Sequence, residues 1–255
     1  MRPTLPRTDD DDQDGIEGGV LVFDPAMSAL PPVTLQGRFV RLEPLSLAHL
    51  PGLLTVVTGP RETFGLTSVP RDEAALRAYI EDAISRHAAG EALPFATIDQ
   101  RDEEPHAASG HRPPAAAARV VGSTRFCNAE RWSWPFDHIP SRPASIDAIE
   151  IGWTWLAPSA QRTALNSEAK LLMLGHAFEA WHVERVTLKT DARNVRSRTA
   201  IERIGGKLDG VLRAHVPAYT GTPGEIRDTA IFSILRAEWP AVKERLEAFV
   251  NRSSR

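Results

Sequence analysis

The 255-residue sequence contains a single cysteine, Cys127, and no long apolar run. One thiol excludes an internal disulfide and a multi-thiolate metal cluster, so we expect no structural metal. No segment approaches the roughly 20 apolar residues of a membrane-spanning helix. The opening MRPTLPRTDDDDQDG is polar and acidic rather than signal-like. We therefore expect a cytoplasmic protein with no membrane partner.

An excess of positive charge is also missing. Lys and Arg number 30 against 33 Asp and Glu, which gives a formal net charge of -3. Proteins that bind nucleic acid normally carry a basic stripe, and the arginines of the last third alternate with acidic residues, so we expect no nucleic-acid partner. The 42% hydrophobic and 25% charged residues are typical of a globular protein.

Composition divides the chain into two parts. Residues 1–30 carry an acidic block at Asp9–Asp12 among glycines and prolines, and they cannot bury enough apolar area to offset chain entropy. They are interpreted as a disordered acidic tail, and residues 31–255 as one domain. Two histidines, His106 and His111, lie in a low-complexity segment between predicted strands and are expected to face solvent.

Hydrophobic periodicity predicts a mixture of strands and helices. Strands are expected at 33–45, 93–98, 119–127, 148–156, 185–190, 208–215 and 229–235. Helices are expected from Pro70 to Gly90 with Leu76, Ile80 and Ile84 inward, at Ser167–Trp181, at Val195–Ile204 and from Trp239. This order combines a meander with a β-α-β crossover, so it predicts an α/β fold with a mixed, mostly antiparallel, twisted sheet flanked by helices.

Two segments carry a family resemblance: EIGWTWLAPSAQRTALNSEAKLLMLGHAFE and LKTDARNVRSRTAIERIGGKLDGVLR. Together with the earlier GRFVRLEPL, they resemble the GNAT superfamily of N-acetyltransferases, specifically its RimJ/RimL-type branch. The resemblance covers roughly residues 34 to 250. It implies the GNAT fold, acetyl-CoA as cosubstrate, an amine acceptor and no metal. Whether the chain forms a homodimer stays open.

The corner between strand and helix is the expected anion site. A helix N-terminus offers free N–H groups and partial positive charge to a diphosphate. The family has Gln/Arg-x-x-Gly-x-Gly/Ala there, whereas this chain has Ala164 and Asn166 in place of the small residues. We expect Asn166 to cap the helix and the anion site to survive if no position needs a positive φ. A capped loop without a ligand is the alternative.

The resemblance implies coenzyme contacts from the strand, the corner and the next helix start. The predicted coenzyme-binding residues are Trp153, Trp155, Leu156, Gln161, Arg162, Thr163, Ala164, Leu165, Asn166, Ser167, Asn194, Ser197 and Arg198. Asn194 would lie beside the pantetheine arm and Ser197 would point toward the thioester sulfur. The residues alone also allow a simple helix cap, in which Asn194 receives the N–H of Ser197.

Transfer to an amine needs a proton acceptor, since amines are largely protonated near neutrality. Glu150, on the strand that the resemblance places beside the acetyl group, is the first candidate for that base. The alternative is a strand carboxylate facing solvent. His215 and Tyr219 are secondary candidates for the base and for the acid to the leaving thiolate. A backbone N–H of the same strand is expected to stabilise the developing oxyanion.

Other candidates stay open at this point. Cys127 has no histidine beside it, so a buried or edge-strand thiol is expected rather than a nucleophile. The tryptophans at 132, 134, 153 and 155 fit either an acceptor pocket or the core. A protein or peptide N-terminal α-amine is the first acceptor, and a small-molecule amine or antibiotic the second. A catalytically silent acyl-CoA sensor is the alternative from another class.

Overall fold

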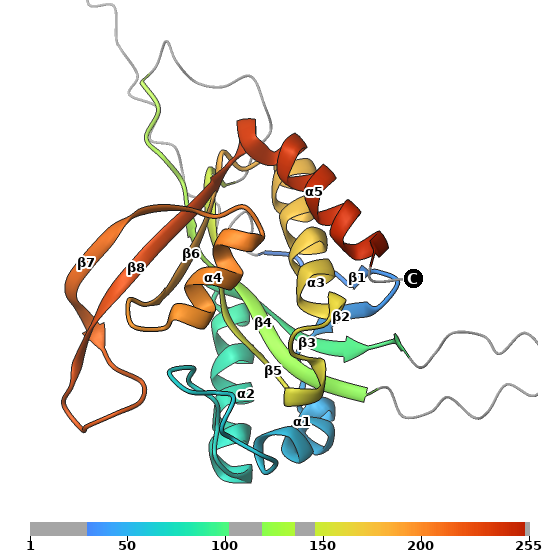
Figure 1. Ribbon diagram of the computed structural model, residues 1–255, viewed down its shortest axis with the longest axis vertical. Coiled ribbons are helices and arrows are strands. Elements are labelled where there is room, and N and C mark those ends of the chain that lie inside the picture. The colour runs from blue at the N-terminus through green and yellow to red at the C-terminus, as the bar shows by residue number, and fades with distance from the viewer. Residues whose placement is uncertain (1–29, 102–118, 136–145, 253–255) are drawn as a thin grey trace, which may run out of the picture.

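The computed structural model describes residues 30–101, 119–135 and 146–252 (Figure 1). Within these ranges the strands form one eight-stranded sheet in the order β1-β2-β3-β4-β5-β6-β8-β7. The strands are β1 (Leu35–Gln36), β2 (Val40–Pro44), β3 (Ala92–Asp99), β4 (Arg119–Glu130), β5 (Ala148–Leu156), β6 (Arg185–Asp191), β7 (Lys207–Pro217) and β8 (Ile226–Leu235). Only β5 and β6 pair in parallel, which confirms the predicted mixed, mostly antiparallel sheet. Residues 1–29, His106 and His111 lie outside the described ranges.

Helices cover both faces of the sheet. They are α1 (Leu50–Val57), α2 (Glu73–Ala88), α3 (Ala164–Gly175), α4 (Val195–Arg203) and α5 (Trp239–Arg252). Helices α3 and α5 lie side by side, and α1 and α2 form a second pair (Figure 1). On β4, Ser123 bonds Tyr79 of α2 while its neighbour Thr124 bonds Lys170 of α3. Because adjacent strand residues point to opposite faces, α2 and α3 lie on opposite sides of the sheet.

The segment predicted as one strand at 33–45 is instead a tight hairpin of β1 and β2. The turn at Gly37 lies against Glu168 of α3, whose carboxylate accepts hydrogen bonds from the backbone N–H groups of Arg38, Phe39 and Val40 at 2.7 to 2.9 Å. A Cβ at Gly37 would lie 2.6 Å from the Glu168 carboxyl carbon. The turn therefore needs glycine because a buried carboxylate fills the space of a side chain.

Helix α3 begins three residues before the predicted start at Ser167. Thr163 is its N-cap, in an extended conformation, and the Thr163 Oγ1 accepts the N–H of Leu165 at 3.3 Å. The prediction that Asn166 caps this helix is therefore wrong, because Asn166 lies inside the first turn. The helix ends at Gly175 and passes into a π-helical turn at His176–Ala180.

The inward face of α2 also differs from the prediction at one position. Leu76 and Ile80 are fully buried as expected, but Ile84 is 37% exposed and Ala83 is buried instead. A rotation of 100° per residue brings position 83 onto the face of Leu76 and Ile80. Gly90, with φ +74, follows the helix as the predicted stop.

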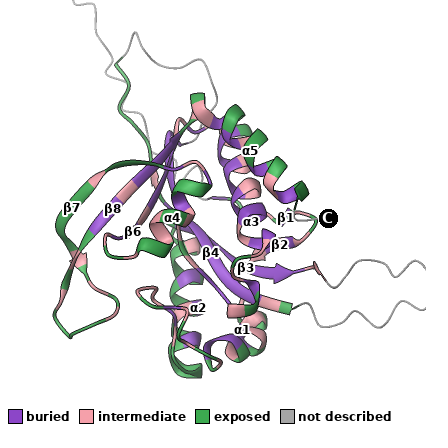
Figure 2. Cartoon of the chain, in the orientation of Figure 1, coloured by how far each residue is buried: buried purple, intermediate pink, exposed green. Residues whose placement is uncertain are grey.

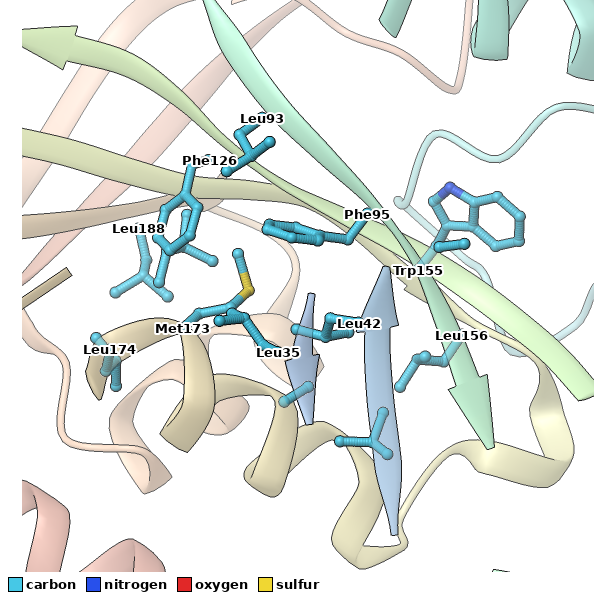
Figure 3. Packing of buried hydrophobic residues seen from close by; sticks show 14 of the residues in the cluster. Leu35, Leu42, Leu93, Phe95, Phe126, Trp155, Leu156, Met173, Leu174 and Leu188 are labelled. Atoms are coloured by element: carbon cyan, nitrogen blue, oxygen red, sulfur yellow. The ribbon is translucent and has the colours of Figure 1, made fainter. Parts of the chain in front are cut away.

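The main core fills the space between the sheet and α3. Phe95, Phe126, Met173 and Leu42 gather there, while Trp155 points away from this cluster on the other side of the strands (Figure 3). Buried residues follow the central strands and the inner sides of α3 and α5, whereas β7 at the end of the sheet is largely exposed (Figure 2). Trp155 is buried on the sheet face toward α2, where its ring lies 6.1 Å from that of Tyr79 between centroids.

Candidate active site

A cavity of about 940 Å³ opens where β5 and β6 separate. Their parallel ladder runs only from Ala148 to Glu150 on β5 and from Arg185 to Thr187 on β6. Beyond it, both strands contribute residues to the cavity wall, together with the loop before α2, the start of α3, α4 and the β7–β8 hairpin. The cavity is thus built from segments far apart in the sequence.

Most of the predicted site residues meet at this cavity. Its wall includes Glu150, Trp153, Trp155, Leu156, Gln161, Arg162, Asn166, Asn194, Ser197, His215 and Tyr219. Five predicted coenzyme residues are not part of the wall: Thr163, Ala164, Leu165, Ser167 and Arg198. Of these, Ala164, Leu165 and Ser167 are buried, and Arg198 donates to the Ala192 carbonyl at 3.3 Å.

The corner before α3 contains a positive φ, so the condition under which the anion site was expected to survive is not met. Arg162 has φ +59, a left-handed conformation that favours glycine, whereas Ala164 is the first helical residue. The residue whose side chain conflicts with the backbone is thus Arg162 and not Ala164. The chain nevertheless forms the corner, and the first turn of α3 follows it directly.

Gln161 anchors this corner to its surroundings. Its amide nitrogen donates to the Leu156 carbonyl at 2.9 Å and to the Thr63 hydroxyl at 3.1 Å. Arg196, at the start of α4, donates to the Gln161 side-chain oxygen at 2.8 Å and to the Thr63 carbonyl at 2.6 Å. These bonds join the starts of α3 and α4 to the loop before α2, and they fix one side of the cavity.

Helix α4 begins as predicted. The Asn194 Oδ1 accepts the backbone N–H of Ser197 at 3.0 Å, which confirms the cap. Both residues also line the cavity. Capping and a contact with a ligand are compatible, because the cap uses the backbone of Ser197 and leaves its hydroxyl free of that bond.

Glu150 is 9% exposed and points into the cavity wall, so the solvent-facing alternative does not hold. Its Oε2 lies 2.9 Å from the Lys189 ammonium and accepts a hydrogen bond from the Asn128 amide at 2.8 Å. Its Oε1 faces Gly152, where a Cβ would lie only 3.0 Å away. Two donors therefore hold one oxygen in place, and the absent side chain at position 152 leaves space beside the other.

A β-bulge lies next to Glu150 on the same strand. Arg125 pairs with Gly152, and Ser123 pairs with Trp155. Between these two pairs, β4 has one residue and β5 has two, so β5 carries the extra residue of the bulge. Trp153 has φ +53, and neither it nor Thr154 has a partner in the ladder. Bulges of this kind interrupt the ladder and redirect backbone groups and side chains. Here the bulge turns Trp153 into the cavity.

The tryptophans divide between the two interpretations left open by the sequence. Trp155 is 3% exposed and belongs to the core, while it also forms part of the cavity wall. Trp153 is 40% exposed and lies 5.7 Å from Tyr219 between ring centroids. Trp132 and Trp134 are exposed, contact each other and do not line the cavity.

Two buried cations of the cavity wall were not predicted as site residues, and Lys170 is the first. Its ammonium is fully buried and donates to the hydroxyls of Thr124 at 3.0 Å and Thr154 at 2.8 Å. Burial lowers the pKa of Lys170 from 10.5 to about 7. The signal was present, because Lys170 shares the buried helical stripe of Met173 and Leu174.

The second such residue is Arg125 on β4, which is 1% exposed in the cavity wall. Its only sequence signal is a charged residue inside a strand.

Cys127, two residues on, behaves as expected. Burial, reinforced by the nearby Glu150, raises the pKa of the Cys127 thiol to about 12, so the thiol stays protonated near neutrality.

Two kinds of feature are missing from the part of the chain that the structure describes. Within the described ranges, no group of three or more His, Cys, Asp or Glu is placed to hold a metal ion. Among the same residues, no helix is both long and apolar enough for a membrane span.

Comparison with protein families matches residues 40–207 to the acetyltransferase (GNAT) domain. Among solved structures, an acetyltransferase described as putative from T. thermophilus is 31% identical, with a TM-score of 0.62 and coverage of 86% of this chain and 97% of that one. A GCN5-related N-acetyltransferase from Brucella melitensis is 26% identical, with a TM-score of 0.66 and 86% of each chain covered. Mycobacterium smegmatis RimJ in complex with CoA-disulfide is 18% identical, with a TM-score of 0.62 and coverage of 85% and 94%. Comparison with curated proteins gives no match.

Proposed function

Because the chain belongs to the GNAT family of acetyl-CoA-dependent N-acetyltransferases, we propose that it acetylates a primary amine within a ternary complex. The first acceptor class is the α-amine of a protein or peptide, as in the RimJ/RimL-type branch that the sequence resembles. The fold of RimJ from Mycobacterium smegmatis supports this branch at the level of architecture alone. An amine of a small molecule is the second class.

The charge of the cavity is the observation that carries this proposal. The chain has a formal net charge of -3, yet its cavity wall contains eight Arg or Lys residues against two Glu. The basic residues are Arg86, Arg125, Arg162, Lys170, Lys189, Arg196, Arg203 and Arg227, and the acidic ones are Glu91 and Glu150. A basic cavity in an acidic protein favours a polyanionic ligand, and coenzyme A carries a diphosphate and a further phosphate.

The α3 corner suits the diphosphate. Asn166 of the first turn of α3 lines the cavity, and the partial positive charge of the helix N-terminus favours an anion beside it. Arg162 adds a full charge beside that turn, while Gln161 and Arg196 hold the loop in place. At the start of α4, Asn194 is proposed to lie beside the pantetheine arm and Ser197 to point toward the thioester sulfur.

Glu150 and the bulge are proposed to act at the reacting end. Lys189 and Asn128 hold the Glu150 carboxylate in the wall, where it accepts the amine proton directly or through one water. A backbone N–H at the bulge of Trp153 stabilises the negative charge that develops on the acetyl oxygen. The neutral amine then attacks the thioester carbon, and a second nitrogen proton passes to water as the amide forms. The C–S bond breaks, and the thiolate leaves with a proton that His215 or Tyr219 supplies.

A direct attack is favoured over an acyl-enzyme. Cys127 is the chain's only cysteine, and its raised thiol pKa leaves almost no thiolate near neutrality. Holding both reactants in one cavity gives the rate advantage that a covalent intermediate would otherwise provide.

The test is release of coenzyme A thiol from acetyl-CoA by the purified chain with a panel of amines. The panel holds peptides with a free or blocked α-amine, lysine side chains and small amines. Release that depends on a free amine supports the transferase, and the preferred acceptor class follows from kcat/KM. Tight binding of acetyl-CoA without release for any amine would instead favour an acyl-CoA sensor.

A further inference from the structure

The guanidinium of Arg125 is buried in the cavity wall without a hydrogen-bond partner. None of its three nitrogens makes a hydrogen bond among the described residues, although the residue is 1% exposed. The nearest carboxylate oxygen, Oδ2 of Asp82, lies 3.7 Å from Nη1. Both Asp82 oxygens accept hydrogen bonds from the Nε of Arg86 at 3.0 and 3.1 Å. A buried cation without hydrogen bonds is costly, which calls for a functional explanation.

Two aromatic rings contact the guanidinium. Its central carbon lies 4.9 Å from the ring centroid of Tyr79 on α2 and 4.7 Å from that of Trp153 on the bulge of β5. Contacts with aromatic rings do not use the N–H hydrogen bonds of a guanidinium, which stay available for a planar, bidentate acceptor. Trp153 is the half-exposed cover on the cavity side. Because all three nitrogens are buried, a ligand reaches them only when the Trp153 side chain shifts.

Arg125 and Glu150 lie on the same face of the sheet. Arg125 pairs with Gly152 and Cys127 pairs with Glu150, so Arg125 and Glu150 are diagonal neighbours. Such neighbours have Cα atoms about 7 to 8 Å apart. Gly152 lies between them without a side chain. An acceptor whose amine is at Glu150 thus has space to place a second group at Arg125 a few bonds away.

The charge balance of this wall selects a monoanion. Glu150 is paired with Lys189, and Asp82 is paired with Arg86. Arg125 is then left as one positive charge with only the distant Asp82 oxygen beside it. A carboxylate matches one guanidinium in both charge and bidentate geometry.

We propose that Arg125 binds a carboxylate of the acceptor, so that the enzyme prefers amines that carry a carboxylate a few bonds from the reacting nitrogen. This proposal rests on the transferase function above and names the acceptor chemistry of the same site. Two sources provide this chemistry: a free amino acid, or a peptide whose first residue is acidic. The reaction is unchanged, since Arg125 orients the acceptor and takes no part in proton or acyl transfer.

Four matched amines distinguish the contribution of the α-carboxylate from that of the side-chain carboxylate. They are L-glutamate, L-glutamine, glutamic acid α-amide and glutamine α-amide, which carry both carboxylates, the α-carboxylate only, the side-chain carboxylate only, or neither. Two peptide amides, Glu-Ala-Ala and Gln-Ala-Ala, form the second arm. The purified full chain is assayed with each for release of coenzyme A thiol. Glutamate is expected to exceed glutamine α-amide in kcat/KM by about 10- to 100-fold, the range of a charged hydrogen bond.

Variants assign this preference to Arg125. In Arg125→Met, the ratio of kcat/KM for glutamate to kcat/KM for glutamine α-amide should fall close to one, while the turnover of glutamine α-amide is kept. Arg125→Lys should retain part of this preference. Arg77→Met removes a solvent-facing cation from the same helix that carries Tyr79, outside the cavity, and should leave the ratio unchanged. Retained turnover of the neutral amine shows that the variant is folded.

The outcomes separate the two proposals. If the natural chain acetylates neutral amines as well as or better than their carboxylate partners, the role of Arg125 is refuted while the transferase stands. The same holds if Arg125→Met keeps the full ratio. If no amine of any kind gives thiol release, the transferase proposal itself fails. Because the wild-type ratio is measured first, an unfolded variant does not leave the inference untested.

Discussion

Replacing Lys170 with methionine should stabilise the protein at neutral pH. Among the described residues, the buried Lys170 ammonium has two threonine hydroxyls and a sulfur as partners, and its pKa falls from 10.5 to about 7. Methionine has a similar length and no charge to bury. The hydroxyls of Thr124 and Thr154 lie 2.8 Å apart and can bond each other once the amine is gone.

The magnitude follows from the difference between the folded and unfolded pKa of Lys170. Between pH 7 and 10.5 the unfolded chain holds a proton at Lys170 that the folded chain releases, so the contribution to stability becomes less unfavourable as pH rises. At about 1.4 kcal/mol per pKa unit, the penalty is about 4 kcal/mol at pH 7, about 2 kcal/mol at pH 9 and close to zero above pH 10.5. Methionine removes it.

Urea unfolding of the wild type and Lys170→Met at pH 7 and pH 9 measures this difference. The variant should be more stable by several kcal/mol at pH 7, and its advantage should shrink by about 2 kcal/mol at pH 9. Lys207→Met, a change at a lysine whose side chain is 75% exposed, should alter stability by less than about 1 kcal/mol at both values. A methionine variant that is less stable at pH 7, or whose advantage is independent of pH, refutes the reasoning.

Four further changes test other parts of the site. Arg162→Gly should raise stability by about 1 kcal/mol in urea unfolding, since Arg162 has φ +59, and should lower acetyl-CoA affinity, since it removes a charge at the proposed anion site; a loss of stability would contradict the backbone strain at Arg162. Glu150→Gln should lower kcat about 100-fold with little change in acetyl-CoA affinity, and the deficit should shrink as pH rises toward the amine pKa of about 8; an unchanged pH–rate profile excludes Glu150 as the base. Ser197→Ala should lower turnover about tenfold and spare affinity measured by calorimetry, whereas a selective loss of affinity makes Ser197 a coenzyme contact. Gly37→Ala should cost about 2 kcal/mol in urea unfolding, because its Cβ would meet the Glu168 carboxylate, and an unchanged midpoint would argue against that contact.

The order of strands and helices could be predicted because it depends on local periodicity. The strand at 148–156 and the α4 start at Asn194 follow from residues close in the sequence, and both are confirmed. The β1–β2 turn was missed because the partner that forces it, Glu168, lies about 130 residues away on α3. Long-range contacts of this kind leave no local pattern.

The site, too, could be predicted where it depends on local sequence and not where it depends on long-range contacts. Strand and helix starts bring Glu150, Gln161 and Asn194 to one cavity, as the family resemblance implied. The positive φ at Arg162 and the missing partners of Arg125 could not be predicted. Both arise from how separate segments meet, since a backbone angle and a lack of hydrogen bonds are properties of the folded cavity rather than of residue type.

Calorimetric titration with acetyl-CoA and with S-acetylpantetheine, which lacks the diphosphate, tests the central claim most directly. If the α3 corner holds the diphosphate, acetyl-CoA binds to one site per chain, and S-acetylpantetheine binds much more weakly. The difference in affinity between the two ligands should decrease with added salt. Equal affinity for both ligands, or no binding of acetyl-CoA, would contradict the assignment of this cavity.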